Sequence, residues 1–153
     1  MRPANATFQS DKLIRFHHCD PAGIVFYPQY FVLFHELMEE WFTEGLQTDY
    51  GEYVRNARLG VPAVTAACEF FAPSQLGDVV DFRLQPTRLG NSSLAFVGEA
   101  TGKHQLRARA HITVVQMSLD TRQSVPFAAP LRARITTYLA PANPVDAPGP
   151  TAT

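Results

Sequence analysis

The stretch that decides the fold covers residues 19–45 and reads CDPAGIVFYPQYFVLFHELMEEWFTEG. From Pro28 onward, apolar side chains recur at the three-and-four spacing of one buried helix face: Phe31, Phe34, Leu37, Met38, Trp41 and Phe42. Pro28 suits a first helical turn, where its missing N–H is not needed, and Gly45 stands where a left-handed residue would end the helix. The pattern predicts a long helix over residues 28–45. Burying each large side chain would contribute about 1.5–3 kcal/mol, which makes this helix the centre of the core.

A turn precedes this helix. Pro21 fixes one backbone dihedral, and Gly23 allows a conformation closed to other residues. The N–H groups at the helix start carry partial positive charge and suit an oxygen that becomes negative during a reaction. Asp20 then supplies a carboxylate beside them. Asp, Pro and Gly before a helix are also ordinary capping and turn residues, so spacing alone favours a purely structural role.

Residues 16–30 resemble the active-site segment of the 4-hydroxybenzoyl-CoA thioesterases of the hot-dog superfamily. That family's pattern is Asp-Pro-x-Gly-Ile-Val-aromatic-Tyr-Pro-x-Tyr, and Asp20 to Tyr30 matches it throughout. A weaker similarity in the order and length of segments extends over about residues 8–139. The resemblance implies hydrolysis of an acyl-CoA thioester without a cofactor or metal.

The resemblance also assigns catalytic roles. Asp20 would be the nucleophile or the general base, the backbone N–H of Tyr27 would polarise the thioester carbonyl, and Gly23 would let the backbone approach the thioester closely. An ordinary carboxylate is ionised at pH 7 and available to attack, yet it is a weak base for activating water. Against attack, a carboxylate is a better leaving group than a thiolate, so the adduct would tend to collapse backwards. Both roles stay open, with a slight preference for the nucleophile.

The substrate-binding set that follows from the resemblance is aromatic in character: Pro28, Tyr30, Phe31, Phe34 and His35. His35 stands where relatives that act on the 4-hydroxy compound place a carboxylate for the ring hydroxyl. We therefore expect an aromatic acyl-CoA, of the benzoyl or hydroxybenzoyl type, without a commitment to 4-hydroxybenzoyl.

For the CoA end, Arg88, Asn91 and Ser92 occupy the region of the family's basic residues. Lys103, Arg107 and Arg109 are further candidates that could equally be solvated strand charges.

Composition fits a small enzyme. The chain has 153 residues, 46% hydrophobic and 18% charged, which indicates a single packed domain over residues 1–140. Residues 141–153 are rich in Pro and Ala and are expected to be a disordered tail. A net charge of −1, no basic cluster and no long apolar run argue against nucleic acid or membrane partners and favour a cytoplasmic protein. Cys19 and Cys68 fit that compartment as reduced thiols, although spacing does not exclude a bridge.

Apolar segments follow the helix; the first, residues 61–71, is apolar and β-branched, and later ones alternate between apolar and polar residues. They predict strands over residues 61–71, 78–88, 93–101 and 105–119, a hairpin turn at 89–91, and a short helix at about 131–139. An earlier strand is expected to end over residues 13–17, and a turn with a short irregular helix over residues 47–58. This is an α+β pattern, an antiparallel sheet wrapped around one helix, and it matches the hot-dog fold. By resemblance, a homodimer that assembles into a homotetramer is expected, with sites at the interface.

Other functions remain open at this stage. The chain could act on short or medium acyl-CoA or on an acyl-carrier protein, or it could bind acyl-CoA without catalysis. A hot-dog dehydratase is disfavoured by the long match to the thioesterase turn. A metal site formed by His17, His18, Cys19 and Asp20 is improbable, because consecutive strand residues point to opposite faces. Cys19 could be a thiol nucleophile only if its pKa were lowered.

Overall fold

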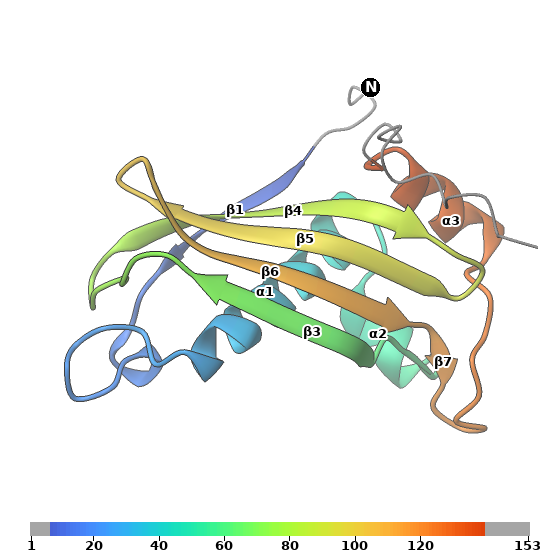
Figure 1. The fold of residues 1–153 in the computed structure, drawn as a ribbon. Helices are drawn as coiled ribbons and strands as arrows, with labels where there is room; N and C mark the ends of the chain where they lie inside the picture. Colours follow the sequence, from blue (N-terminus) through green and yellow to red (C-terminus); the bar gives the residue numbers. More distant parts are fainter. Residues whose placement is uncertain (1–6, 140–153) are drawn as a thin grey trace, which may run out of the picture.

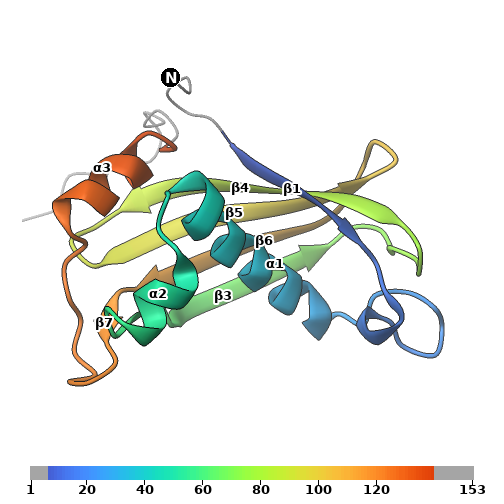
Figure 2. The same cartoon turned by 180° about the vertical axis from the view of Figure 1, so that it is seen from behind.

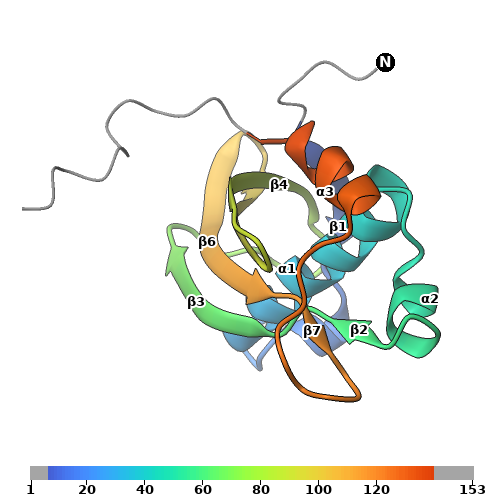
Figure 3. The ribbon, with the colours of Figure 1, turned by 90° about the vertical axis from the view of Figure 1, so that its right-hand side faces the viewer.

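A computed structural model describes residues 7–139 of the chain. Its main feature is a five-stranded antiparallel sheet in the order β1-β4-β5-β6-β3. The strands are β1 (Phe8–Leu13), β3 (Ala63–Phe70), β4 (Val79–Leu89), β5 (Ser93–Gly102) and β6 (Gln105–Val115). The sheet curves around helix α1 (Pro28–Glu40), which lies on its concave side (Figures 1 and 3). The predicted α+β layout is confirmed.

Smaller elements surround this unit. Phe16–His18 (η1) form a 3-10 turn, and Trp41–Gly45 (η2) form a π-helical turn that continues α1. Helix α2 (Tyr50–Arg55) and the two-stranded pair β2 (Leu59–Gly60) and β7 (Met117–Ser118) lie on the same side as α1, and helix α3 (Ala129–Thr136) lies at one end of the sheet (Figure 2). None of the helices in residues 7–139 is long and apolar enough to cross a membrane.

The buried face of α1 forms the core, as its spacing predicts. Phe34, Leu37 and Met38 are fully or almost fully buried, and Trp41 and Phe42 continue the face into the π turn. The face is wider than expected, because Tyr30 and Leu33 are buried too, whereas Phe31 is only half-buried. Phe34 lies directly against Gly98 on β5, where an added Cβ would lie 2.6 Å from the ring. The helix therefore packs closely on the sheet through this contact.

The prediction that the helix ends at Gly45 is correct, but the conformation predicted for this glycine is wrong. Gly45 does not adopt a left-handed conformation; the residue with positive φ is Gln47, at 53°. The helix loosens into a π turn, in which the Leu46 N–H donates to the Trp41 oxygen at 2.8 Å. A Cβ at Gly45 would lie 2.6 Å from the Trp41 ring. Glycine is therefore required by close packing against the indole.

The strand predictions hold with shifted ends. The first strand stops at Leu13, since Phe16–His18 turn back as a 3-10 helix instead of extending the strand to residue 17. The strand expected over residues 105–119 is divided, because β6 ends at Val115 and Met117 and Ser118 pair with β2. The hairpin turn at residues 89–91 is confirmed by the Gly90 N–H donating to the Ser93 oxygen. The tail expected over residues 141–153 lies outside the described residues.

Strand β3 forms one edge of the sheet and pairs only with β6 among the described strands. Seven of its eight residues are exposed, and Val64, Phe70 and the neighbouring Phe71 present large apolar side chains to solvent. An open strand edge with apolar side chains is a template for pairing with another chain.

Candidate active site

Asp20 begins a tight turn just before α1. The Gly23 N–H donates to the Asp20 backbone oxygen at 2.9 Å, and the Asp20 N–H donates to the Ile24 oxygen at 3.0 Å. Gly23 has a φ of +76°, so a residue with a side chain would be strained there. An added Cβ would meet no atom of the chain within 4 Å. The fold therefore requires glycine at this position for its backbone conformation and not for lack of space.

Asp20 is a half-buried residue, and its carboxylate takes part in the turn. Its Oδ1 accepts a hydrogen bond from the Ala22 N–H at 2.8 Å, which fixes the orientation of the side chain. Among residues 7–139, no donor contacts Oδ2. One carboxylate oxygen is therefore held in place while the other stays available.

Tyr27 immediately precedes α1, and Pro28 is the first helical residue. The Tyr27 backbone oxygen accepts from the Tyr30 N–H at 3.2 Å, so the helix is already hydrogen-bonded at this residue. The Tyr27 N–H has no acceptor within the described part of the chain, as expected for the start of a helix. A donor with partial positive charge is thus available on the same turn as Asp20.

A second loop, residues 71–78 between β3 and β4, holds this turn in place. The Val25 N–H donates to the Ser74 oxygen at 2.9 Å, and the Leu76 N–H donates to the Gly23 oxygen at 3.0 Å. The Tyr30 hydroxyl donates to the Ser74 Oγ at 2.9 Å, and Ser74 is completely buried. Nothing in the local sequence pattern reveals these contacts, because the partners lie about fifty residues apart.

An aromatic cavity of about 310 Å³ opens between the turn and this loop. Its walls include Tyr27, Tyr30, Phe70 and Phe71. The ring centroid of Phe70 lies 6.1 Å from that of Tyr27 and 5.7 Å from that of Tyr30. Burial raises the pKa of Tyr30, so this phenol stays neutral and acts as a hydrogen-bond donor to Ser74. The cavity suits a flat apolar group.

Phe31 and His35 line a different cavity, of about 370 Å³, further along α1. Its other walls are apolar residues that include Met38, Ala63 and Ala66. The His35 Nε2 lies 3.8 Å from a Glu39 carboxylate oxygen, one helical turn on. The residues predicted to bind substrate are thus divided between two cavities along β3. Pro28 lines neither, and Phe34 lies in the core behind them, packed against Phe82.

The residues predicted to bind CoA lie at the other end of the sheet. Arg88, Asn91 and Ser92 belong to the β4–β5 hairpin beside α3, whereas the turn before α1 is at the opposite end (Figure 1). The backbone oxygens of Asn91 and Ser92 accept from Phe127 and Gln116 N–H groups, and α3 contributes a further cation, Arg132, bonded to the Gly90 oxygen at 2.7 Å. A single chain does not bring this group to Asp20.

The three further cations differ in their surroundings. Lys103 is exposed at the β5–β6 turn, and Arg109 forms a half-exposed ion pair with Glu99 at 3.0 Å. Arg107 is buried, with a side chain only 7% exposed, so it is neither a solvated strand charge nor free to meet a nucleotide.

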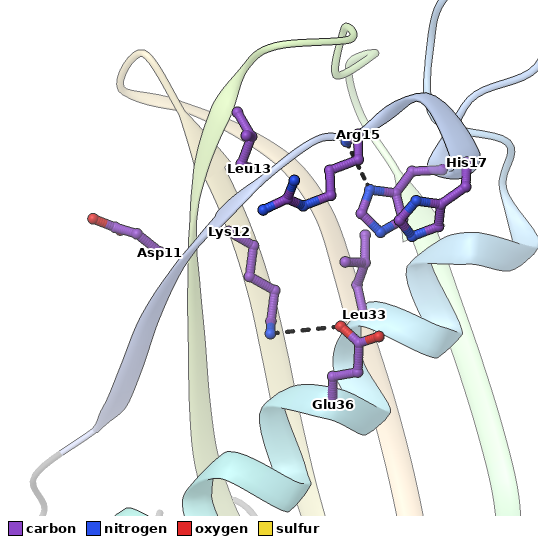
Figure 4. A pocket seen from close by; sticks show the side chains of 8 residues that line it. Asp11, Lys12, Leu13, Arg15, His17, Leu33 and Glu36 are labelled. Atoms are coloured by element: carbon purple, nitrogen blue, oxygen red, sulfur yellow. Dashed lines mark hydrogen bonds and ion pairs between the residues drawn. The ribbon is translucent and has the colours of Figure 1, made fainter.

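A polar pocket of about 300 Å³ lies between β1 and α1 (Figure 4). Here the Nδ1 of His18 accepts from the Arg15 N–H at 2.9 Å, and the His18 backbone oxygen accepts from the Phe26 N–H at 2.9 Å. Burial, with a smaller contribution from the neighbouring His17, lowers the pKa of His18. The buried Lys12 ammonium is paired with Glu36 at 3.7 Å and with Glu40. Through these two hydrogen bonds, His18 therefore supports the segment of chain that leads into Asp20.

The two thiols are free and poorly suited to nucleophilic attack. Burial, together with the charge of Asp20, raises the pKa of Cys19, and burial raises the pKa of Cys68 to about 11. Both therefore remain protonated near neutral pH. Within residues 7–139, no three His, Cys, Asp or Glu side chains converge to hold a metal ion.

The fold and the similarity to known proteins identify a hot-dog thioester hydrolase. The profile of the Thioesterase-like superfamily matches residues 14–135, and the chain belongs to that superfamily. This match confirms the superfamily and does not by itself distinguish the 4-hydroxybenzoyl-CoA thioesterases within it.

Its relatives include named enzymes. The 1,4-dihydroxy-2-naphthoyl-CoA hydrolase of Synechococcus elongatus is 27% identical over 128 residues, which cover 80% of this chain and 90% of that one. Among solved structures, a 1,4-dihydroxy-2-naphthoyl-CoA thioesterase from Synechocystis is 26% identical with a TM-score of 0.77, over 85% of this chain and 96% of that one. A gentisyl-coenzyme A thioesterase is also 26% identical, with a TM-score of 0.76, over 83% and 98% of the two chains.

Proposed function

We propose that this protein hydrolyses the CoA thioester of an aromatic acid, with hydroxylated benzoyl and naphthoyl groups as the first candidates. The observation that carries the proposal is the turn itself, which presents the Asp20 carboxylate and the unbonded Tyr27 N–H next to an aromatic cavity. The named relatives act on dihydroxylated aromatic CoA thioesters, which supports the aromatic class.

The reaction follows from these two groups. As the acyl carbon is attacked, negative charge develops on the thioester oxygen, and the Tyr27 N–H at the helix start stabilises it. We propose that the free Oδ2 of Asp20 attacks the acyl carbon and expels the CoA thiolate. Water then hydrolyses the resulting anhydride, which releases the acid and restores the carboxylate. In the alternative, the same oxygen accepts a proton from the attacking water.

Single-turnover hydrolysis in heavy-oxygen water tests the covalent route. If water attacks the aspartyl carbonyl of the anhydride, one labelled oxygen remains in Asp20, which only the covalent route produces. General-base hydrolysis leaves the enzyme unlabelled and puts the label in the released acid, as does attack of water on the acyl carbonyl of an anhydride.

The open β3 edge supports self-association. Two copies paired through β3 across a two-fold axis would run antiparallel, so the Phe70 end of one strand would lie beside the Ala63 end of its partner. The aromatic cavity of one protomer would then adjoin the second cavity of the other, which contains Phe31 and His35. This pairing would reunite the divided substrate-binding set, and we propose a homodimer as the functional unit, with a homotetramer as its further assembly.

The same antiparallel pairing would bring the β4–β5 hairpin of one protomer toward the Asp20 end of the other. We propose that Arg88, Asn91 and Ser92 contact the CoA phosphates across the interface. Replacing Arg88 with Ala should raise KM for acyl-CoA several-fold with little change in kcat, because such a contact binds substrate and transition state alike. Equal KM values for Arg88→Ala and wild type would remove Arg88 from the site.

The deciding assay measures thiol release from benzoyl-, hydroxybenzoyl-, gentisyl-, 1,4-dihydroxy-2-naphthoyl-, phenylacetyl- and straight-chain acyl-CoA. Wild type and Asp20→Asn are compared, with Asp11→Asn as a control at an exposed carboxylate on β1. We expect aryl-CoA hydrolysis that falls at least about a hundredfold in Asp20→Asn and is unchanged in Asp11→Asn. Preference for straight-chain or carrier-bound acyl groups would refute the aromatic assignment. Binding without turnover would indicate a sensor.

A further inference from the structure

Arg107 on β6 is a buried cation that the proposed chemistry does not use. Its Nε and Nη2 donate to the Gly102 oxygen at 3.3 and 3.2 Å, and its Nη1 donates to the Pro73 oxygen. The guanidinium packs so closely on Gly102 that a Cβ there would lie 3.1 Å from Nη2. Burying a charge is costly unless it is paired and hydrogen-bonded, and here the donors are directed at fixed backbone oxygens.

Asp78, at the C-terminal end of the loop over residues 71–78, is a further partner of the Arg107 guanidinium. Its Oδ2 lies 3.4 Å from the Arg107 Nη1 and also accepts from the Gln75 N–H at 2.9 Å. The backbone oxygen of Arg107 accepts from the Phe71 N–H at 2.8 Å. Backbone and side chain of one residue thus hold both ends of the loop over residues 71–78.

This loop is the one that contacts the catalytic turn. Ser74, next to Pro73, accepts from the Val25 N–H, and Leu76 donates to the Gly23 oxygen. The position of the turn therefore depends, through two hydrogen bonds, on where the loop is held.

We propose that Arg107, together with Asp78, is a positioning residue for hydrolysis. The proposal rests on the role of Asp20 proposed above, since Arg107 acts by fixing the turn that carries it. A planar guanidinium can bond two carbonyls and a carboxylate in one fixed geometry, whereas the single ammonium of Lys cannot. The site therefore requires the planar geometry of the guanidinium and not only its positive charge.

The test is Arg107→Lys, which keeps the charge. We expect kcat on the preferred aryl-CoA to fall about ten- to a hundredfold, while KM changes by less than about threefold. Exchange of the Val25 and Leu76 amide hydrogens should accelerate at least tenfold, whereas amides of β5 stay protected. Asp78→Asn should act in the same direction more weakly, and it becomes the deciding variant if Arg107→Lys does not fold.

Arg83→Lys serves as the matched control. Arg83 lies on β4 with a half-exposed side chain and pairs with Asp81 at 2.9 Å, away from the loop. We expect its kcat and its amide exchange at Val25 and Leu76 to match wild type.

Unchanged exchange at Val25 and Leu76 in both Arg107→Lys and Asp78→Asn would overturn the proposal. Faster exchange with an unchanged kcat would overturn it as well, because turnover would then not depend on the held loop. If Asp20→Asn retained full activity, the assignment of Asp20 would fail, and the exchange rates would still show whether Arg107 holds the turn.

Discussion

Gly98→Ala tests the contact that seats α1 on the sheet. The new methyl carbon would lie 2.6 and 2.7 Å from two carbons of the Phe34 ring, and both residues are buried. Overpacking of this kind costs about 1–3 kcal/mol. For a domain of this size, 2 kcal/mol corresponds to a Tm lowered by roughly 4–8 °C.

The measurement is urea unfolding followed by the fluorescence of Trp41, the only tryptophan of the chain and fully buried. Protein concentration is held equal between variants, because association would add to stability. Gly51→Ala adds the same methyl group at an exposed position in α2, where the nearest atom is Oδ1 of the exposed Asp49 side chain at 3.2 Å, and it should cost much less stability than Gly98→Ala. Phe34→Leu frees space beside Gly98, so the double variant should be more stable than the sum of the single changes by at least about 0.5 kcal/mol. Wild-type stability in Gly98→Ala would refute this view of the helix–sheet contact.

Three further predictions concern the turn and its supports. The pKa of His18 is lowered in the folded state, so the unfolded state binds more protons below the ordinary pKa of about 6.5, and stability should fall as pH drops from about 7 toward 5. His18→Gln should flatten this pH dependence in thermal unfolding, and an unchanged profile would assign it to other groups. Gly23→Ala should lower kcat and cost about 1–2 kcal/mol, because φ is +76°, and wild-type values for both would show that the turn relaxes. Tyr30→Phe should cost about 1–2 kcal/mol in urea unfolding, because it leaves the buried Ser74 hydroxyl without its donor, and Ser74→Ala in that background should recover part of the loss.

Local pattern was enough for the helix and the strands. The three-and-four spacing located α1, and alternation located β4, β5 and β6, because one face of each of these elements is buried and the other is not. Strand β3 was located by its apolar, β-branched residues, since seven of its eight residues are exposed. The helix end at Gly45 was predicted correctly but for the wrong reason, because glycine is required there by the Trp41 ring that packs on it. A side chain that packs on the backbone of a glycine one helical turn away leaves no distinct pattern in the sequence.

The candidate site was only partly predictable. Asp20, Gly23 and Tyr27 lie within eight consecutive residues, so the turn could be predicted from the sequence, whereas its catalytic role was inferred from the family resemblance. Ser74 and Arg107 could not, because their roles come from contacts with residues more than thirty positions away. The division of Tyr30 and His35 between two cavities follows from the helical rotation between them, and only the position of β3 reveals it.

The loop that holds the turn bearing Asp20 also has a consequence for folding. The Gly23–Leu76 hydrogen bond joins residues 53 positions apart, and Arg107 reaches Pro73 across another 34. Contacts that close such long stretches of chain form only after the strands between them have assembled. During refolding, the environment of Trp41 inside the helix–sheet core should become native before enzymatic activity returns. The return of turnover during refolding would then mark the formation of the last long-range contacts within the chain.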